Sequence, residues 1–560
     1  MFEKLPLSRL LLAILFTPLP ALLAEDAFPV NVTVDATQPI GAVKPIWNWF
    51  GYDEVNYTYL PNGSRVLASL KPTGDNPVYI RAHHMFTSGD GSPALKWGST
   101  GMYREDAQGH PVYDFTVADR IVDTWVKLGL KPLMQMGFMP EALSVKPAGY
   151  PKNPKPTDAN WPGPGCGFSY PPKDYQKWGD LCHVWTKHCV ERYGRTEAAS
   201  WRWQVWNEPN NFYWQGSADE FIKLYDFATD GIRRALPEAV IGGPHSAGID
   251  AAWMSNFFKH CLEGTNHATG GNGAPLDFIA FHAKGAPTFV DGHVQMGIGN
   301  QLGVLESGFR LVADKPALKN KPVIIGESDP DGGAAVISEK FGYRNTPLFA
   351  SYTAAVFLRK TDLAARHGIN LEGAVTWSFV FENAPLFSGQ RQLATQDIDL
   401  PVRHVFRMFD RLRGERIAAS SDAQLGLNEV IAKGVREKPD VGVFAVRDDA
   451  AIKVMLWHYH DIDLPGSAAD VTLSLRLPTG GKRAQIDEFR VDGDHGNPLA
   501  VWTRMGSPAE PSVQQRKDLT AAAEFPVMPQ REVPVAGGKL TTTTQLPRQS
   551  VVLLVITPRS

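Results

Sequence analysis

A glutamate at the end of an apolar run is the first residue whose type and place suggest chemistry. Residues 201–207 read Trp-Arg-Trp-Gln-Val-Trp-Asn, and Glu208 and Pro209 follow. The run is typical of a buried strand, and because proline cannot donate to a strand ladder, the strand must end at the glutamate. A carboxylate at the carboxyl end of a central strand, with an amide beside it, is where a β/α barrel carries catalytic groups. The alternative is a glutamate that only caps the next helix.

A second apolar run ends in the same way. Residues 322–326 read Pro-Val-Ile-Ile-Gly, and Glu327 follows. Hydrolysis of an acetal needs an acid that protonates the leaving oxygen and a carboxylate that attacks the anomeric carbon or activates water. At the ends of the fourth and seventh strands of a barrel, Glu208 and Glu327 would face each other across its mouth. This pair favours a retaining glycosidase.

The elements that must position these glutamates follow from hydrophobic periodicity. Eight runs predict strands, and most are separated by helical patterns such as Val117, Ile121, Trp125 and Leu128 at three- to four-residue spacing. The eight runs are residues 45–50, 78–83, 131–137, 201–207, 240–243, 278–282, 323–326 and 373–378. Eight strands with helices between them predict an α/β protein with a (β/α)8 TIM barrel over residues 41–404. The Pro- and Gly-rich stretch 140–172 is expected to be a long loop on the catalytic rim.

A second domain is expected after the barrel, because the pattern then changes to short alternating runs separated by Gly, Pro and Asp. This change predicts a C-terminal antiparallel β-sandwich over residues 405–560. The alternating segment 30–34 lies within residues 25–40, which we expect to supply a strand to the same sandwich. Two domains also fit a chain of 560 residues.

The composition and the N-terminal segment limit the classes to which the protein can belong. The 56 basic and 59 acidic residues are interspersed, with a formal net charge of -3, so no nucleic-acid or membrane surface is indicated. Residues 1–24 resemble a secretory signal: Lys4 and Arg9 precede an apolar run over 10–16, and Ala24 offers a cleavage point. The sequence therefore predicts export to the periplasm or the medium and no membrane association after cleavage, with an uncleaved anchor as the alternative.

The four cysteines predict no particular pairing. Cys182 and Cys189 are expected in one helix, about 10 Å apart along its axis, which is too far for a disulfide between them or for one shared metal ion. Cys166 and Cys261 complete the set. Export would permit disulfides, and free buried thiols are equally compatible with the sequence.

The motifs around both glutamates are similar to those of glycoside hydrolase family 39, which contains β-xylosidases and α-L-iduronidases. Asn207-Glu208-Pro209 resembles the acid/base motif of the family, and Glu327 in Ile-Ile-Gly-Glu-Ser-Asp resembles its nucleophile strand. Residues 129–140 resemble the third strand, and residues 490–519 resemble the sandwich of the family β-xylosidases. The resemblance covers nearly the whole mature chain.

This resemblance implies catalysis by Glu208 and Glu327 without a cofactor or a metal ion. It also implies that six side chains contact the sugar: His83, Asn207, His282, Lys284, Trp377 and Glu382. His83 and Asn207 resemble residues that bond sugar hydroxyls, and Trp377 resembles an aromatic floor. For each of the six, a rim side chain without sugar contact is the alternative, and for Glu382 the local spacing fits less well.

Lys284 leaves the identity of the sugar open. Many xylosidases of the family have His-x-Tyr after the sixth strand, whereas this chain has His282-Ala283-Lys284, which resembles the iduronidase branch. A lysine suits an anionic sugar, but it could also bond a neutral hydroxyl or lie beside Glu327. We expect an exo-acting β-xylosidase with a small xylo-oligosaccharide substrate. The alternatives are an iduronidase-like or arabinosyl-cleaving enzyme and a non-catalytic carbohydrate-binding protein, and the oligomeric state stays open.

Overall fold

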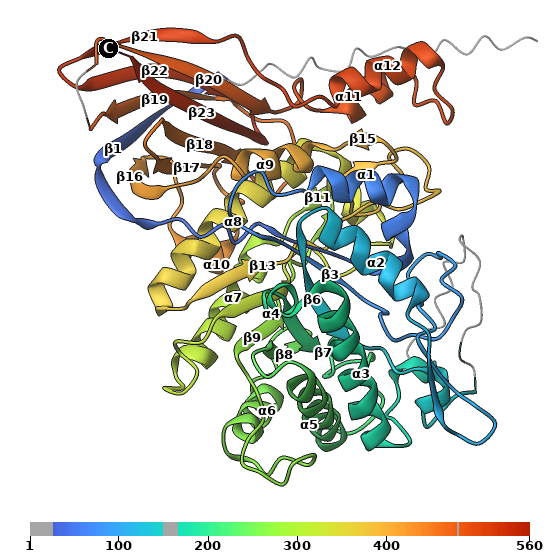
Figure 1. The fold of residues 1–560 in the computed structure, drawn as a ribbon. Helices are drawn as coiled ribbons and strands as arrows, with labels where there is room; N and C mark the ends of the chain where they lie inside the picture. The colour runs from blue at the N-terminus through green and yellow to red at the C-terminus, as the bar shows by residue number, and fades with distance from the viewer. Residues whose placement is uncertain (1–25, 149, 151–165, 479–480, 560) are drawn as a thin grey trace, which may run out of the picture.

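The protein is described here by a computed structural model that covers residues 26–148, 150, 166–478 and 481–559. Two bodies stack on each other, a barrel surrounded by helices and a domain built from strands (Figure 1). The segment 1–24, for which we expect a signal peptide, lies outside the described residues. Within the described residues, no helix combines the length and the apolar character needed to cross a membrane.

The larger body is the predicted parallel barrel. Its sheet has the strand order β13-β12-β9-β8-β7-β6-β3-β2, and a parallel bridge between Phe50 and Thr376 joins its two edges. The strands are β2 (Trp49–Tyr52), β3 (Val78–Ala82), β6 (Leu130–Met136), β7 (Arg202–Val205), β8 (Val240–Ser246), β9 (Phe278–His282), β12 (Val323–Glu327) and β13 (Leu371–Ala374). Each contains residues of one predicted run. The first begins later than predicted because Asn48 donates to the Pro45 carbonyl in a turn.

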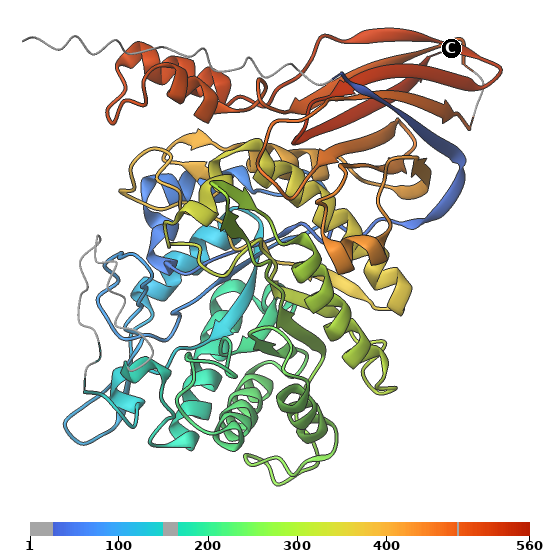
Figure 2. The same ribbon diagram turned by 180° about the vertical axis from the view of Figure 1, so that it is seen from behind.

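Helices cover the outside of the barrel (Figure 2). They are α1 (Pro61–Ser69), α2 (Thr116–Lys127), α3 (Tyr175–Tyr193), α4 (Arg195–Ala199), α5 (Ala218–Ala235), α6 (Ala251–Glu263), α7 (Ile298–Ala313), α8 (Pro347–His367) and α9 (Pro401–Phe409). A capping box opens α5, where Ser217 and Glu220 each accept a backbone hydrogen bond from the other residue. Cys182 and Cys189 both lie in α3, and all four cysteines are buried free thiols.

Short β-hairpins lie in the loops between the barrel elements. They are β4 (Tyr103–Glu105) with β5 (Pro111–Tyr113), β10 (Thr288–Val290) with β11 (His293–Gln295), and β14 (Ala394–Thr395) with β15 (Ile398–Asp399). Within the predicted rim loop 140–172, residues 151–165 lie outside the described part of the chain.

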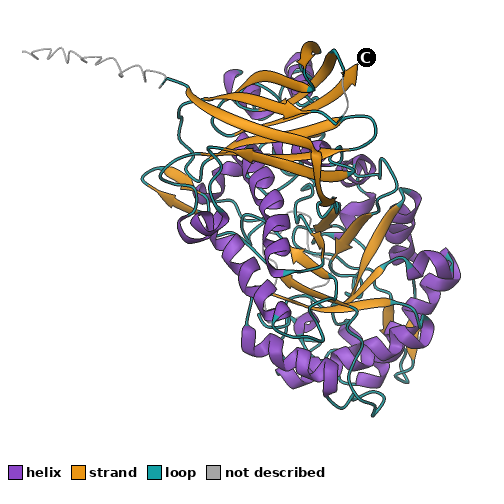
Figure 3. Cartoon of the chain, turned by 90° about the vertical axis from the view of Figure 1, so that its left-hand side faces the viewer, coloured by secondary structure: helices purple, strands orange, loops and turns teal. Residues whose placement is uncertain are grey.

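The second body is a closed, mostly antiparallel sheet (Figure 3), with the order β1-β16-β17-β18-β23-β20-β21-β22-β19. Its strands are β1 (Phe28–Ala42), β16 (Glu415–Ser421), β17 (Asp440–Arg447), β18 (Ile452–Tyr459), β19 (Ala469–Arg476), β20 (Arg483–Val491), β21 (Arg531–Ala536), β22 (Lys539–Leu546) and β23 (Ser550–Arg559). The N-terminal strand β1 pairs antiparallel with β16 and parallel with β19. Val30, Val32 and Val34 alternate into the core of this domain.

The chain passes from the barrel to the second body between α9 and β16, near the expected division at 404/405. That division falls inside α9, and the first strand of the second body after the barrel is β16. Three further helices belong to the C-terminal part: α10 (Leu427–Lys433), α11 (Pro498–Arg504) and α12 (Val513–Ala522).

Helix α8 joins the two bodies. It contacts α7 and α9 on the barrel side and β18 and β23 on the other. Arg359 on α8 donates to Asp440 of β17 at 2.6 Å, and both side chains are buried. Ser351 of the same helix donates to Gln549 at 2.8 Å. The barrel and the sheet domain therefore share one continuous buried interface.

One buried cation in α8 should cost stability. The Lys360 ammonium is buried, lies 3.6 Å from the centre of the Phe357 ring, and has no hydrogen-bond partner among the described residues. Burial lowers the pKa of Lys360 to about 7, whereas the unfolded value is about 10.4. Between these pH values the unfolded chain binds a proton that the folded chain does not, so the free energy of unfolding rises with pH across this window.

Lys360→Met should remove this pH dependence and stabilise the fold most at low pH. We expect a gain of about 2–4 kcal/mol at pH 6 that shrinks toward pH 10, because methionine fills the same space without a charge to desolvate. Urea unfolding of both proteins at pH 6 and pH 9.5 measures the difference. A destabilised Lys360→Met protein at pH 6 would show that the amine is well solvated or paired in the fold.

Candidate active site

Two strand ends bring the predicted glutamates together. Glu327 is the last residue of β12, and Glu208 follows β7 in a turn where Trp206 and Glu208 have φ values of 68° and 45°. The Glu208 amide donates to the His245 carbonyl at 2.9 Å, which anchors this turn to the end of β8. The positive φ at Glu208 is a costly conformation for a residue with a side chain, and in it the carboxyl group reaches His282 at the end of β9.

His282, the last residue of β9, lies between the two carboxyl groups. Its Nδ1 is 2.7 Å from Glu208 Oε1 and 3.8 Å from Glu327 Oε1. One oxygen from each glutamate and a ring nitrogen of His282 all lie within 4.8 Å of one another. Carboxyl groups about 5–5.5 Å apart suit a nucleophile and an acid/base, whereas inverting pairs need about 6.5–9.5 Å to admit a water.

Glu327 is held as an anion by cations on both of its oxygens. Arg81 donates to Oε1 at 3.0 Å, and the Lys284 ammonium lies 2.7 Å from Oε2. Burial alone would raise the pKa of Glu327, but the charges of Lys284, His282 and Arg81 hold it well below its usual range. The residue is therefore ionised at neutral pH. Two cations at this carboxylate also oppose a third, so the cluster is poorly suited to a metal ion.

Arg81 organises the floor of the site from strand β3. It is fully buried, and it donates to Gln204 Oε1 at 2.8 Å and to Asn207 Oδ1 at 2.6 Å as well as to Glu327. The Nδ2 group of Asn207 is buried and has no hydrogen-bond partner in the described part of the chain. A buried donor without a partner is costly, so Asn207 is suited to bind a ligand hydroxyl. Arg81 was missed as a site residue, although an arginine inside an apolar strand is itself a signal.

His83 and Trp377 form one wall beside Glu327. The His83 Nε2 atom is 3.7 Å from Glu327 Oε1, and its Nδ1 is 2.9 Å from Asp53. Burial lowers the pKa of His83, although the adjacent Asp53 opposes this shift. The Trp377 ring lies 4.4 Å from the His83 ring and 4.8 Å from the Arg81 guanidinium.

Gly51 leaves space for the Trp377 ring, and Asp53 holds His83 from the side away from Glu327. A side chain at Gly51 would place its Cβ 2.2 Å from the Trp377 ring, so only glycine leaves room there. Asp53, just beyond the end of β2, forms an ion pair with Lys96 on its other side. Like Glu208, Asp53 is an acidic residue just past a strand end, and that position was the signal that could have found it.

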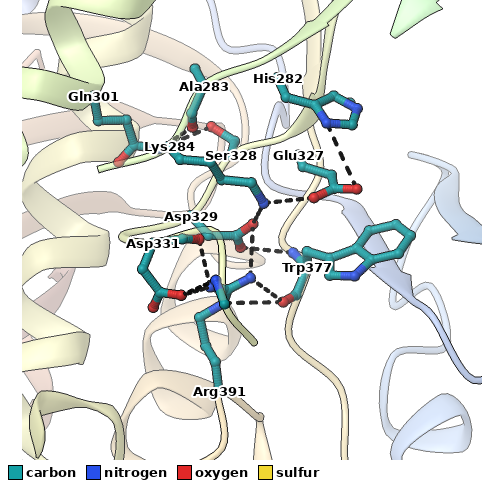
Figure 4. Close-up of polar contacts among 12 residues, drawn as sticks. His282, Ala283, Lys284, Gln301, Glu327, Ser328, Asp329, Asp331, Trp377 and Arg391 are labelled. Carbon is teal, nitrogen blue, oxygen red and sulfur yellow. Dashed lines mark hydrogen bonds and ion pairs between the residues drawn. The ribbon is translucent and has the colours of Figure 1, made fainter. Parts of the chain in front are cut away.

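Lys284 lies beside Glu327, one of the three positions considered for it above. Besides Glu327, its ammonium contacts Asp329 Oδ2 at 2.5 Å (Figure 4). Gln301 of α7 fixes the chain between His282 and Lys284, because its side-chain amide donates to the Ala283 carbonyl at 2.9 Å. Tyr352 of α8 in turn donates to Gln301 at 2.5 Å. The interdomain helix therefore supports the loop that carries Lys284.

Glu382 is the one predicted site residue whose hydrogen bonds lead elsewhere. Its carboxylate accepts from the Gly63 amide and from the Asn62 side chain, each at 2.9 Å, at the start of α1. A carboxylate at a helix N-terminus is a favourable pairing by itself. The other seven predicted residues, by contrast, are linked to one another through Glu327 and Arg81, and the sugar contact of Glu382 stays a prediction.

Known proteins resemble this chain in sequence and in fold. A sequence model of the glycosyl hydrolases family 39 matches residues 32–540. A β-xylosidase of Geobacillus stearothermophilus is 27% identical over 495 residues, which is 85% of this chain and 86% of the relative. An α-L-iduronidase of Mus musculus is 25% identical over 579 residues, which is 97% of this chain and 83% of the relative. The crystal structure of a family 39 enzyme from Xanthomonas axonopodis pv. citri has a TM-score of 0.73 at 20% identity, covering 95% of this chain and 98% of the other.

Proposed function

Because this chain belongs to glycosyl hydrolases family 39 and is therefore a glycoside hydrolase, we propose that it is a retaining exo-glycosidase that removes terminal β-D-xylosyl residues from xylo-oligosaccharides. The observation that carries the retaining mechanism is the close approach of the two carboxyl groups, within 4.8 Å at their nearest oxygens. This distance suits direct attack by one carboxylate.

In the first step, Glu327 attacks the anomeric carbon while Glu208 donates its proton to the leaving oxygen. The glycosidic bond breaks, and an ester bond joins the sugar to Glu327. In the second step, Glu208 takes a proton from water, the water oxygen attacks the anomeric carbon, and the ester bond breaks to release Glu327 as a carboxylate. Arg81 and Lys284 stabilise that departing carboxylate, and Asn207 offers its free amide to a sugar hydroxyl.

A neutral pentose is the substrate that we favour. The Lys284 ammonium already contacts two protein carboxylates, those of Glu327 and Asp329. A sugar carboxylate would have to compete with both of them. The match to a β-xylosidase over most of both chains supports the same choice. The second candidate is an α-L-iduronide, which the presence of a lysine at this position and the match to an α-L-iduronidase favour.

We further propose that the enzyme is exported by its N-terminal segment and acts on small products of xylan degradation. The charged and apolar pattern of residues 1–24 supports export.

A screen of aryl glycosides tests the substrate. We expect turnover of nitrophenyl β-D-xyloside that exceeds turnover of the matched α-L-arabinoside and α-L-iduronide. Measurable hydrolysis of the iduronide with none of the xyloside would contradict the proposed sugar and leave the glycosidase mechanism standing. Tight binding of xylo-oligosaccharide without turnover of any of the three glycosides would instead indicate a non-catalytic carbohydrate-binding protein.

A further inference from the structure

The Lys284 ammonium is shared between two carboxylates with different roles. It lies 2.7 Å from Glu327 Oε2 and 2.5 Å from Asp329 Oδ2 (Figure 4). The Glu327 side chain is 10% exposed, whereas Asp329 lies two residues beyond the strand end with its side chain 1% exposed. A cation between two anions attracts each less strongly than it would attract one alone.

Asp329 is fixed by contacts that do not depend on Lys284. Its Oδ1 accepts from the Trp377 amide at 2.8 Å, and its Oδ2 is 3.3 Å from the buried guanidinium of Arg391. Arg391 also donates to the Trp377 carbonyl at 3.0 Å and to Asp331 at 2.6 Å. Asp329 is therefore a preorganised anion that links the nucleophile strand to the backbone of Trp377.

The reaction changes the charge on only one of the two partners of Lys284. When Glu327 becomes an ester it loses its negative charge, while Asp329 keeps its own. Without Asp329, the positive charge of Lys284 would be neutralised by Glu327 in the free enzyme. It would have no neighbouring carboxylate in the glycosyl-enzyme intermediate, in which Glu327 is an ester. A cation bound to Glu327 alone would also hold the attacking electron pair more tightly.

We propose that Asp329 is a positioning residue, the permanent counter-ion that holds Lys284 beside Glu327 and limits how tightly Lys284 binds the nucleophile. This inference rests on the proposed role of Glu327 as nucleophile. Other charged or titratable groups surround the pair on every side, and they come from β3, the turn after β7, β8, β9, the loop after β13 and α8. They are Arg81, His83, Glu208, Tyr213, His245, His282, Tyr352, Lys360 and Arg391.

The two partners of this ion pair should shift the pH profile in opposite directions. The acid limb of kcat/KM reports ionisation of the free enzyme. Lys284→Met removes the charge that stabilises ionised Glu327. The acid limb of the kcat/KM profile of this variant should therefore move to higher pH, and kcat/KM should fall about 10–150-fold. Asp329→Asn removes an anion, so that Lys284 pairs with Glu327 alone. The acid limb of the kcat/KM profile of this variant should therefore move to lower pH by about one unit.

The rates of the two steps should separate as well. Asp329→Asn should slow formation of the glycosyl-enzyme by about 10-fold or more, because Glu327 is held more tightly. It should not slow hydrolysis of the intermediate, since Lys284 is then freer to stabilise the departing carboxylate. Inactivation by 2-deoxy-2-fluoro-β-xylosyl fluoride measures the first step across pH, and reactivation of the trapped enzyme measures the second.

Asp331→Asn is the matched control. Asp331 lies in the same loop and contacts the same Arg391, but its other partners are Arg344 and Tyr343. It should lower thermal stability without moving the acid limb downward. Asp329→Glu, which keeps the charge, should return the limb toward its wild-type position even if its fold is less stable.

The outcomes are distinguishable. If the acid limbs of Asp329→Asn and Lys284→Met move upward together, or if Asp331→Asn reproduces the Asp329→Asn shift, Asp329 has only a structural role. If the fluoro sugar labels a residue other than Glu327 in the wild-type enzyme, the proposed function fails instead. Labelling of Glu327 with no shift of the limb in Asp329→Asn overturns the inference alone.

Discussion

Glu327→Ala should reduce turnover of every glycoside substrate by at least about 10⁴-fold, the scale expected when a covalent nucleophile is removed. The loss should be similar for good and poor leaving groups, because every substrate must pass through the attack on the anomeric carbon that this variant lacks. Removing this carboxylate also leaves Arg81 and Lys284 beside an apolar side chain, so substrate binding should weaken as well. Initial rates on nitrophenyl β-D-xyloside and on xylobiose measure the effect.

The matched control for this change is Glu372→Ala. Glu372 is also a glutamate in a barrel strand and is paired with an arginine, Arg202, at 2.5 Å, but it lies near the start of β13 and away from the carboxyl ends of the strands. It should lose some stability and keep its turnover. Added azide should give Glu327→Ala only an α-glycosyl azide. A β-glycosyl azide from this variant would mean that the roles of the two glutamates are exchanged.

Glu208→Ala should divide the substrates by their leaving groups. Loss of the acid should slow cleavage of xylobiose by about 10²–10⁴-fold, the usual contribution of general acid–base catalysis. Aryl xylosides with good leaving groups need little protonation, so their first step should be nearly spared. The second step then lacks its base, and glycosyl-enzyme should accumulate as a burst of nitrophenol followed by slow turnover.

Azide tests the same variant independently. It needs no general base, so it should restore turnover of Glu208→Ala on nitrophenyl β-D-xyloside and give a β-glycosyl azide. His282 and Asn211, which contact the Glu208 carboxyl group at 2.7 Å each, should keep their positions in this variant. The space left by the missing carboxyl group can then admit azide. An equal loss on good and poor leaving groups, with no effect of azide, would contradict the assignment of Glu208 as acid/base.

The sequence was sufficient to predict the barrel strands and the positions of the two glutamates at strand ends, because these signals are local. Each barrel strand is a short apolar run, and Pro209 and the Ile-Ile-Gly run mark where Glu208 and Glu327 must lie. Once eight strands form a closed parallel sheet, their carboxyl ends converge by geometry. The alternation of Val30, Val32 and Val34 likewise predicted a strand facing the core of the sheet domain, and these side chains lie there.

The surroundings of the glutamates could not be predicted because they join segments with no shared pattern. Asp329, Trp377 and Arg391 come from three loops or strand ends, and each of their contacts depends on how the barrel closes. Glu382 was assigned to the site only by the family resemblance, and its hydrogen bonds go to the start of α1, which lies far away in the sequence. Periodicity predicts which face of an element is buried, but not which ion pairs form beyond its end.

The position of the covalent bond is the most direct test of the account. The wild-type enzyme is inactivated with 2-deoxy-2-fluoro-β-xylosyl fluoride, digested with a protease and analysed by tandem mass spectrometry. The account predicts one fluoroxylosyl group, bonded to the side chain of Glu327 in the peptide that contains Ile-Ile-Gly-Glu-Ser-Asp. A label on Glu208, or a time-dependent inactivation that leaves Glu327 unmodified, would contradict it.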